Sequence, residues 1–171
     1  MEISIISESP KETRILAAFL TQAILNYHYY CLNKKNALII SLEGDLGAGK
    51  TEFMKGIAES LKLKNDVLSP TFLIMKKFDL PEKYHNNFSC LWHLDCYRLK
   101  NLKELKSLGF EDIIKDKKNL IFIEWGQKIK KLLPAKSWVI KFKTLDKNRR
   151  LLTFQIPISK PISKKEFSKS N

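Results

Sequence analysis

Runs of hydrophobic residues bounded by polar segments divide the chain into predicted strands and helices. Residues 37–42 and 120–123 are short, continuous aliphatic runs, which are typical of strands buried on both faces of a parallel sheet. Residues 89–95 predict a further strand, in which His93 and Asp95 fall on the same face. These three segments predict the centre of a mostly parallel sheet.

Alternating patterns elsewhere in the chain predict strands of a different kind. Residues 138–142 and 152–156 alternate apolar and polar positions, and the polar link between them predicts a hairpin-like antiparallel pair. Residues 3–6 predict a short first strand, and the loop around Ser69-Pro70 leads into an extended segment that ends at Phe78. The sequence therefore predicts antiparallel strands added to the parallel sheet.

Three segments predict helices. Ser9-Pro10-Lys11-Glu12 has the Ser-x-x-Glu form of a capping box with proline at the first helical position, so a helix begins there and ends before residue 33. Residues 51–61 carry apolar side chains at a spacing of four, and residues 102–108 predict a short amphipathic helix closed by Gly109. In the first helix, the positions expected to pack on the sheet are Leu16, Phe19, Leu20, Ala23, Ile24 and Tyr27.

The length of the chain predicts one domain. A chain of 171 residues is long enough for a single sizeable core and short for two typical domains. We expect the domain to cover residues 1–158. The Lys- and Ser-rich segment 159–171 has little to bury, so we expect a basic, disordered tail.

The composition favours a cytoplasmic protein. The net charge of +13 favours polyanionic partners, but the excess is almost all lysine and a coding bias explains it equally well. The three cysteines lack metal-ligand spacing and indicate reduced thiols. The sequence shows neither a signal peptide nor a run long enough to span a bilayer, so no membrane is expected as a partner. DNA is not expected as a partner either.

Residues 44–51 carry the most specific chemistry in the chain. They read Gly-Asp-Leu-Gly-Ala-Gly-Lys-Thr, a complete G-x-x-x-x-G-K-[ST] phosphate-binding loop (P-loop), and they lie between a predicted strand and a predicted helix, as such a loop requires. A glycine-rich turn that matches by chance is the structural alternative. The residues expected to contact a nucleotide here are Gly44, Asp45, Leu46, Gly47, Ala48, Gly49, Lys50 and Thr51.

The physical chemistry of this loop explains its residue types. Glycines allow positive φ angles, which turn several backbone N–H groups toward an anion, and the helix N-terminus adds its partial positive charge. We expect Lys50 to bridge the β and γ phosphates and the Thr51 hydroxyl to ligate a nucleotide-bound Mg²⁺.

Two carboxylates follow predicted strands and are candidates for the remaining chemistry. Glu124 comes directly after the buried run 120–123, so it emerges at the carboxyl edge of the sheet, where an acid reaches Mg²⁺ directly or through water. Asp95 ends its own strand and is placed to orient or deprotonate the attacking water. The structural alternatives are a turn-capping role for Glu124 and an ion pair between Asp95 and Arg98. His93 is more readily interpreted as a partly buried strand residue than as a catalytic base.

Four motifs in this order resemble the TsaE (YjeE) family of bacterial P-loop ATPases. They are the loop GDLGAGKT, the tetrapeptide Ser69-Pro70-Thr71-Phe72, the segment HLDCYRL at 93–99 and the run Ile123-Glu124-Trp125. The resemblance spans about residues 3–156. It implies a three-layer α/β fold of the P-loop NTPase type.

The resemblance also implies a function and partners. Members of this family act in the threonylcarbamoyl modification of an adenosine in tRNA, together with the proteins TsaD and TsaB. ATP hydrolysis, with ATP and Mg²⁺ as cofactors, is expected to support turnover of that complex, slowly in the absence of the partners. Contact with tRNA is expected indirectly, through the complex.

Carried over residue by residue, the resemblance implies roles for individual side chains. It makes Lys50, Asp95 and Glu124 catalytic and Thr51 and Glu124 the metal ligands. It further implies nucleotide contacts that the loop alone does not suggest, at Thr13, Thr71, Trp125 and Arg149. The chain has Gly126 where relatives usually have proline, which leaves the backbone freer at that corner.

Other functions of a P-loop protein leave different marks in a sequence. A GTPase switch needs Asn-Lys-x-Asp and D-x-x-G elements, which the sequence lacks. A small-molecule kinase of the P-loop class usually closes an arginine-bearing lid, and arginine is scarce here. A nucleotide-gated binding module, in which ATP orders the Thr71 loop so that a partner docks, is the non-enzymatic alternative.

Overall fold

A computed structural model of the protein describes residues 1–31, 36–63, 74–84 and 87–157. The expected tail at 159–171 and the loop that contains Thr71 lie outside the described residues.

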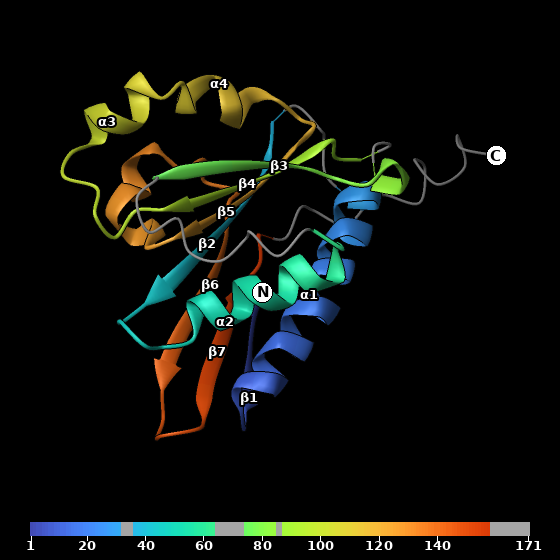
Figure 1. The fold of residues 1–171 in the computed structure, drawn as a ribbon, viewed down its shortest axis with the longest axis vertical. Coiled ribbons are helices and arrows are strands. Elements are labelled where there is room, and N and C mark those ends of the chain that lie inside the picture. The colour runs from blue at the N-terminus through green and yellow to red at the C-terminus, as the bar shows by residue number, and fades with distance from the viewer. Residues whose placement is uncertain (32–35, 64–73, 85–86, 158–171) are drawn as a thin grey trace.

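The described residues form a seven-stranded sheet in the order β1-β7-β6-β2-β5-β4-β3 (Figure 1). The strands β6, β2, β5 and β4 run parallel to one another, while β7, β1 and β3 are antiparallel to their neighbours. The predicted parallel centre and the predicted hairpin are therefore confirmed. The bounds are β1 (Glu2–Ser7), β2 (Leu38–Gly44), β3 (Met75–Asp79), β4 (Cys90–Asp95), β5 (Asn119–Glu124), β6 (Trp138–Thr144) and β7 (Arg150–Gln155).

Helices cover both faces of this sheet and make the fold three-layered. The long helices α1 (Pro10–Cys31) and α2 (Lys50–Ser60) pack on one face (Figure 1). The opposite face of β2, β5 and β4 is covered by α3 (Leu102–Ser107), α4 (Phe110–Lys115) and the 3₁₀ segment η3 (Gly126–Leu132). A further 3₁₀ turn, η2 (Glu82–Tyr84), lies between β3 and β4. The pattern of the sequence did not predict α4 or η3.

The core under α1 and α2 fixes the position of the P-loop. Phe53 of α2 is fully buried and meets the ring of Phe142 of β6 edge-on, with 5.4 Å between ring centroids. Phe122 of β5 and Ile40 of β2 are likewise fully buried in this core. Because α2 begins at the end of the P-loop, this packing holds the loop against the carboxyl ends of β2 and β5.

The face of α1 that packs on the sheet matches the prediction only in part: Leu20 packs against the core and Leu16 is half-buried, as predicted. The buried positions are Thr13, Ala17, Thr21 and Leu25, whereas Phe19 is 73 % exposed and Ala23 is also exposed. Small residues face inward because α1 and α2 approach closely: a Cβ on Gly56 would lie 2.3 Å from the Arg14 carbonyl oxygen. The predicted positions Ile24 and Tyr27 lie outside the described side chains.

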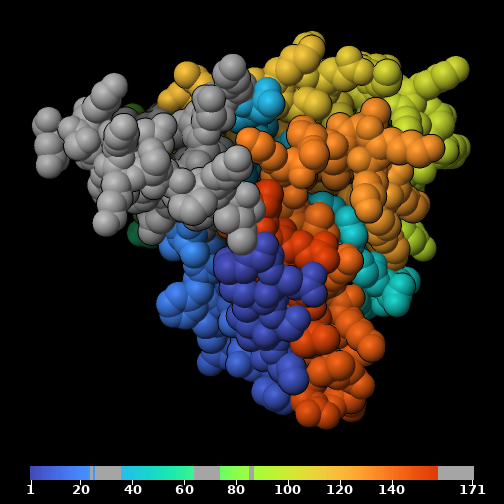
Figure 2. Space-filling view, turned by 180° about the vertical axis from the view of Figure 1, so that it is seen from behind, coloured from blue at the N-terminus to red at the C-terminus, as the bar shows by residue number. Residues whose placement is uncertain are grey.

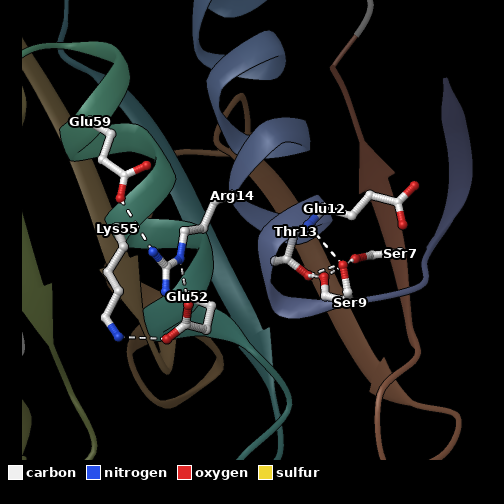
Figure 3. A network of polar contacts seen from close by, with 8 residues as sticks. All are labelled: Ser7, Ser9, Glu12, Thr13, Arg14, Glu52, Lys55 and Glu59. Carbon is white, nitrogen blue, oxygen red and sulfur yellow. Dashed lines mark hydrogen bonds and ion pairs between the residues drawn. The ribbon is translucent and has the colours of Figure 1, made fainter.

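The start of α1 has the predicted capping interactions (Figure 3). Ser9 Oγ accepts a hydrogen bond from the Glu12 N–H at 3.2 Å, as the capping box predicts. The Glu12 carboxylate accepts a hydrogen bond at 2.6 Å from the N–H of Glu8, one residue before Ser9. One turn later, the Arg14 guanidinium pairs with Glu52 of α2 at 2.7 Å. The Arg14–Glu52 pair fixes α1 against the helix that follows the P-loop, and the contact of Ser7 Oγ in β1 with the Thr13 hydroxyl, at 2.7 Å, fixes it against β1.

Within residues 1–31, 36–63, 74–84 and 87–157, helices cover only one face of the strands β6, β7 and β1. On the other face, which we call the open face, side chains are exposed or half-buried, among them Ser4, Ile6, Lys141, Lys143, Leu151 and Thr153. Figure 2 shows this side of the molecule, with β1 in dark blue and β7 in red at the surface. Among the described helices, none is long and apolar enough to cross a membrane.

Candidate functional site

The P-loop connects β2 to α2 in the conformation that its glycines permit. Gly44, Gly47 and Gly49 have φ angles of +147°, +75° and +103°, as predicted for a loop that turns N–H groups inward. A Cβ on Gly44 would lie 2.5 Å from the carbonyl oxygen of Phe142 in β6. At this position glycine is therefore required by close packing as well as by backbone conformation.

Lys50 is buried at the centre of the site. Its side chain donates hydrogen bonds of 2.7 Å to the carbonyl oxygens of Gly44 and Asp45. Burial lowers the pKa of the Lys50 ammonium, while the charges of Glu124, Asp45 and Asp95 act in the opposite direction. The two acids predicted from strand ends, Glu124 and Asp95, therefore interact electrostatically with the P-loop lysine.

Glu124 links α2, β5 and β4. Its Oε2 accepts a hydrogen bond from the Thr51 hydroxyl at 3.3 Å, and its Oε1 lies 3.0 Å from His93 Nε2. Glu124 is 4 % exposed and His93 1 % exposed. The register pairs Glu124 with Asp95 on β4 and with Leu42 on β2. The carboxyl ends of three parallel strands therefore meet at this point.

Asp95 lies at the rim of the same cluster. It is partly exposed, and its Oδ1 accepts a hydrogen bond from the Tyr97 N–H at 2.9 Å. The Cys96 N–H donates to the Glu124 carbonyl at 3.0 Å, which ties the end of β4 to the end of β5. Asp95 thus combines a fixed backbone with a carboxylate that remains open to solvent.

Trp125 covers Lys50. The Lys50 ammonium lies 3.9 Å from the centroid of the Trp125 ring, and Tyr97 packs against the same ring with centroids 5.0 Å apart. Trp125 has a φ of +62°, which is rare for a bulky residue, and its N–H donates to the Leu42 carbonyl at 2.9 Å. Strain at this point accompanies a tight corner, as is common at functional sites.

Gly126, which follows Trp125, packs closely against Ser41 of β2. Gly126 is buried, and a Cβ there would lie 1.9 Å from the Ser41 hydroxyl oxygen of β2. The freedom expected at a corner without proline is therefore limited by close packing.

The turn between β6 and β7 brings two arginines near the P-loop, with different partners. Arg149 donates to the Asp146 carboxylate at 2.6 Å and reaches Glu8 at 4.0 Å. Arg150 instead donates to the Gly47 carbonyl oxygen of the P-loop at 3.3 Å and to the Asp146 carbonyl oxygen at 2.8 Å. The residue predicted from the resemblance, Arg149, thus lies beside the one that contacts the loop.

Thr13 is engaged in the N-terminal network shown in Figure 3. It is 2 % exposed, and its hydroxyl lies 2.7 Å from Ser7 Oγ and donates to the Ser9 carbonyl oxygen at 3.2 Å. A nucleotide contact at Thr13 remains a prediction, as does any role of Thr71, which lies outside the described residues.

The donor atoms at Thr51 and Glu124 fit a magnesium ion. Mg²⁺ prefers oxygen ligands and usually takes one or two from the protein and the rest from water and phosphate. A hydroxyl and a carboxylate oxygen 3.3 Å apart at the start of α2 meet that requirement. Within the described ranges, no group of three or more His, Cys, Asp or Glu side chains is placed to hold a metal ion.

Sequence reasoning missed two contacts in this cluster. Arg150 gave no signal because Arg149 precedes it and the turn decides which side chain points at the P-loop. His93 was placed on the correct strand face, but its hydrogen bond to Glu124 crosses between strands and depends on the stagger of β4 and β5.

Comparison with known proteins gives consistent matches. A family model described as "Threonylcarbamoyl adenosine biosynthesis protein TsaE" matches residues 7–152. The chain is 37 % identical over 148 residues to a Rickettsia typhi tRNA threonylcarbamoyladenosine biosynthesis protein TsaE, covering 86 % of this chain and 90 % of the relative. It is 34 % identical over 146 residues to the Bacillus subtilis protein of the same name, covering 85 % and 80 %.

A solved structure matches the fold. The crystal structure of YdiB from Bacillus subtilis superposes with a TM-score of 0.65 at 29 % sequence identity. The match covers 91 % of this chain and 86 % of that chain. The seven-stranded arrangement with a parallel centre is thus shared with a protein solved by experiment.

Proposed function

The chain belongs to the TsaE family and has that family's role in the threonylcarbamoyladenosine modification of tRNA; from this premise we propose that it binds and hydrolyses Mg-ATP to support turnover of a TsaD–TsaB complex. One observation carries the proposal. The Thr51 hydroxyl, the Glu124 carboxylate and the Lys50 ammonium come together at the mouth of a P-loop whose glycines have positive φ angles.

The P-loop and its lysine bind the phosphates in this proposal. The backbone N–H groups of the loop and the N-terminus of α2 surround the anion, and Lys50 exchanges its two loop carbonyls for phosphate oxygens. Thr51 and Glu124 hold the metal. A Mg²⁺ ion held there by Thr51 and Glu124 would supply positive charge against the charge that develops on the phosphates. Trp125 lies over Lys50 and limits the access of water to it.

Asp95 handles the attacking water. It is the cluster's partly exposed carboxylate, and its backbone is fixed by the neighbouring strand. From this position it orients a water molecule and accepts its proton as the water oxygen bonds to the γ-phosphorus and the bond from that phosphorus to ADP breaks. Hydrolysis is slow without partners, because groups supplied by another protein often complete the arrangement around the water.

The test separates nucleotide binding from hydrolysis. We expect Asp95→Ala to bind ATP with near-normal affinity and to abolish phosphate release stimulated by purified TsaD and TsaB. Calorimetry measures the affinity, and a phosphate-release assay measures turnover. Analysis of the reaction for phosphorylated small molecules, compared with free phosphate, distinguishes hydrolysis from a kinase activity.

A matched control lies on the neighbouring strand. Asp79 also ends a strand, but β3 runs antiparallel to β4 and so places it at the opposite edge of the sheet, fully in solvent. Asp79→Ala should leave both readouts unchanged. Partner-stimulated release that survives in Asp95→Ala would assign Asp95 a structural role. ATP-dependent docking on TsaD and TsaB without any release by the unmodified protein would favour the nucleotide-gated binding module.

A further inference from the structure

His93 is a buried polar residue that the proposed chemistry does not yet use. It lies on β4 between Leu91 and Asp95, on the face that α1 and α2 cover, and 1 % of its surface is exposed. The residues on each side of it in β4, Trp92 and Leu94, are hydrophobic, whereas its partner across the strand pair with β3 is Lys76. Its ring lies 3.0 Å from Glu124 Oε1, an atom that belongs to the candidate metal ligand.

The protonation of the ring follows from this contact. An ionised carboxylate only accepts hydrogen bonds, so Nε2 of His93 carries a proton and its N–H donates a hydrogen bond to Glu124 Oε1. In a neutral ring the other nitrogen, Nδ1, is then an acceptor. It is buried, and within the part of the chain that the structure describes it has no hydrogen-bond partner.

An unpaired buried acceptor destabilises the folded protein, and an aliphatic side chain of similar size would avoid this loss. The packing of the core therefore does not account for a histidine at position 93. The hydrogen bond to Glu124 does, because a leucine cannot donate it.

We infer that His93 is a positioning residue for Glu124. Its Nε2–H holds Oε1, so that Oε2 is presented to the side where the Thr51 hydroxyl lies. The inference rests on the proposed function, since it assigns His93 a purpose only if Glu124 ligates a metal. Ligating carboxylates are commonly held by such outer hydrogen bonds.

The cluster explains why Glu124 needs this support. Glu124 has rotatable side-chain bonds and lies in the electrostatic field of the Lys50 ammonium. Without the bond from His93, the carboxylate is free to turn toward Lys50. That rotation would move a Glu124 oxygen away from the metal position. It would also pair Glu124 with the Lys50 ammonium, which in the proposed function binds the phosphates.

The experiment measures how much Mg²⁺ strengthens ATP binding. Calorimetry gives the ATP affinity with Mg²⁺ and with a chelator present, and the ratio of the two is the metal-dependent gain. We expect His93→Leu to reduce this gain about 10- to 100-fold, with the affinity in chelator unchanged. His93→Gln, whose amide N–H can reach the position of Nε2–H, should retain most of it.

A control separates positioning from general destabilisation. Leu91→Ala removes a fully buried side chain two residues earlier on the same face of β4. It should lower the free energy of unfolding while leaving the metal-dependent gain intact. Should His93→Leu fail to fold, His93→Asn replaces it, because its shorter amide cannot reach Glu124.

Each outcome decides the matter. A gain that persists in His93→Leu, or that falls equally in His93→Gln, overturns the positioning role. A gain lost in His93→Leu and kept in His93→Gln and Leu91→Ala supports it. Failure of the unmodified protein to bind ATP in either condition would instead overturn the proposed function, so the two failures are distinguishable.

Discussion

The sheet has two regions that differ in how far their strands are buried. The inner strands are β2, β5 and β4, and the outer strands are β6, β7 and β1. All six residues of β5 are buried, and its polar side chains, Asn119 and Glu124, stand at its two ends. In β7, by contrast, fully buried residues alternate with half-buried ones, as one covered face requires. The inner strands are covered on both faces. The two carboxylates of the candidate site, Asp95 and Glu124, are the last residues of β4 and β5.

This difference accounts for the position of the candidate site. Between two helical layers, a polar atom without a partner lowers stability, and Glu124 and His93 share a hydrogen bond there. The outer strands place polar side chains along their length without such a requirement. Their contribution to the site comes from the turn between β6 and β7, which lays Arg150 on the P-loop.

The largest expected effect tests the contrast in packing. Phe122→Ala empties a fully buried position of β5 and should lower the free energy of unfolding by about 3–5 kcal/mol. Lys141→Ala, on the open face of β6, should change it by no more than about 0.5 kcal/mol. Chemical denaturation measures both. Similar losses in the two variants would contradict the distinction between inner and outer strands.

A second, smaller effect concerns the junction of the two regions. Gly44 of β2 pairs with Phe142 of β6, and a Cβ at Gly44 would clash with that residue's carbonyl oxygen. Gly44→Ala should therefore destabilise the fold by about 1–3 kcal/mol more than Gly47→Ala. Gly47 also has a positive φ but has nothing within 4 Å of its would-be Cβ, so it reports backbone strain alone. Equal losses by denaturation would mean that strain, not contact with β6, decides the cost.

The sequence predicted the elements that have strong local signals. The strand before the P-loop and the helix after it were placed within two residues of their observed ends, because aliphatic runs and the glycine-rich loop mark both boundaries. The alternation of β6 and β7 predicted their antiparallel pairing. The approach of Glu124 to the P-loop followed from a general rule: parallel strands end at one edge.

Elements without such signals were missed or misjudged. The helix α4 begins directly after Gly109, the glycine that closes the predicted helix 102–108, so that glycine concealed the start of a second helix. In α1, apolar residues occur on several sides, and which side faces inward is decided by the close approach of Gly56 to Arg14. Partners across strands, such as His93 and Glu124, depend on the stagger between strands, which no local pattern encodes. The roles of individual site residues therefore stay predictions until variants are measured.

The smallest expected effect lies at the tip of the outer strands and depends on pH. Hydrogen bonds from the backbone and side chain of Arg149 and from the Asn148 N–H lower the pKa of Asp146 from its ordinary value of 3.8 to about 2. Because the folded pKa is depressed, the stabilisation of this turn is present above about pH 4 and is lost as the pH falls through about 2. NMR measures this loss: the amide resonances of Asn148 and Arg149 should titrate with a midpoint near pH 2.

The Asp146 side chain is exposed, so solvent screens its charge and the consequence is limited to the turn itself. Arg150 is the link to the inner strands, because it joins the Asp146 carbonyl oxygen to the Gly47 carbonyl oxygen. Loosening the turn in acid should thus broaden the Gly47 resonance before it affects β5. Asp146→Asn should abolish the titration near pH 2, and a midpoint that persists in this variant would show that another carboxylate controls the turn.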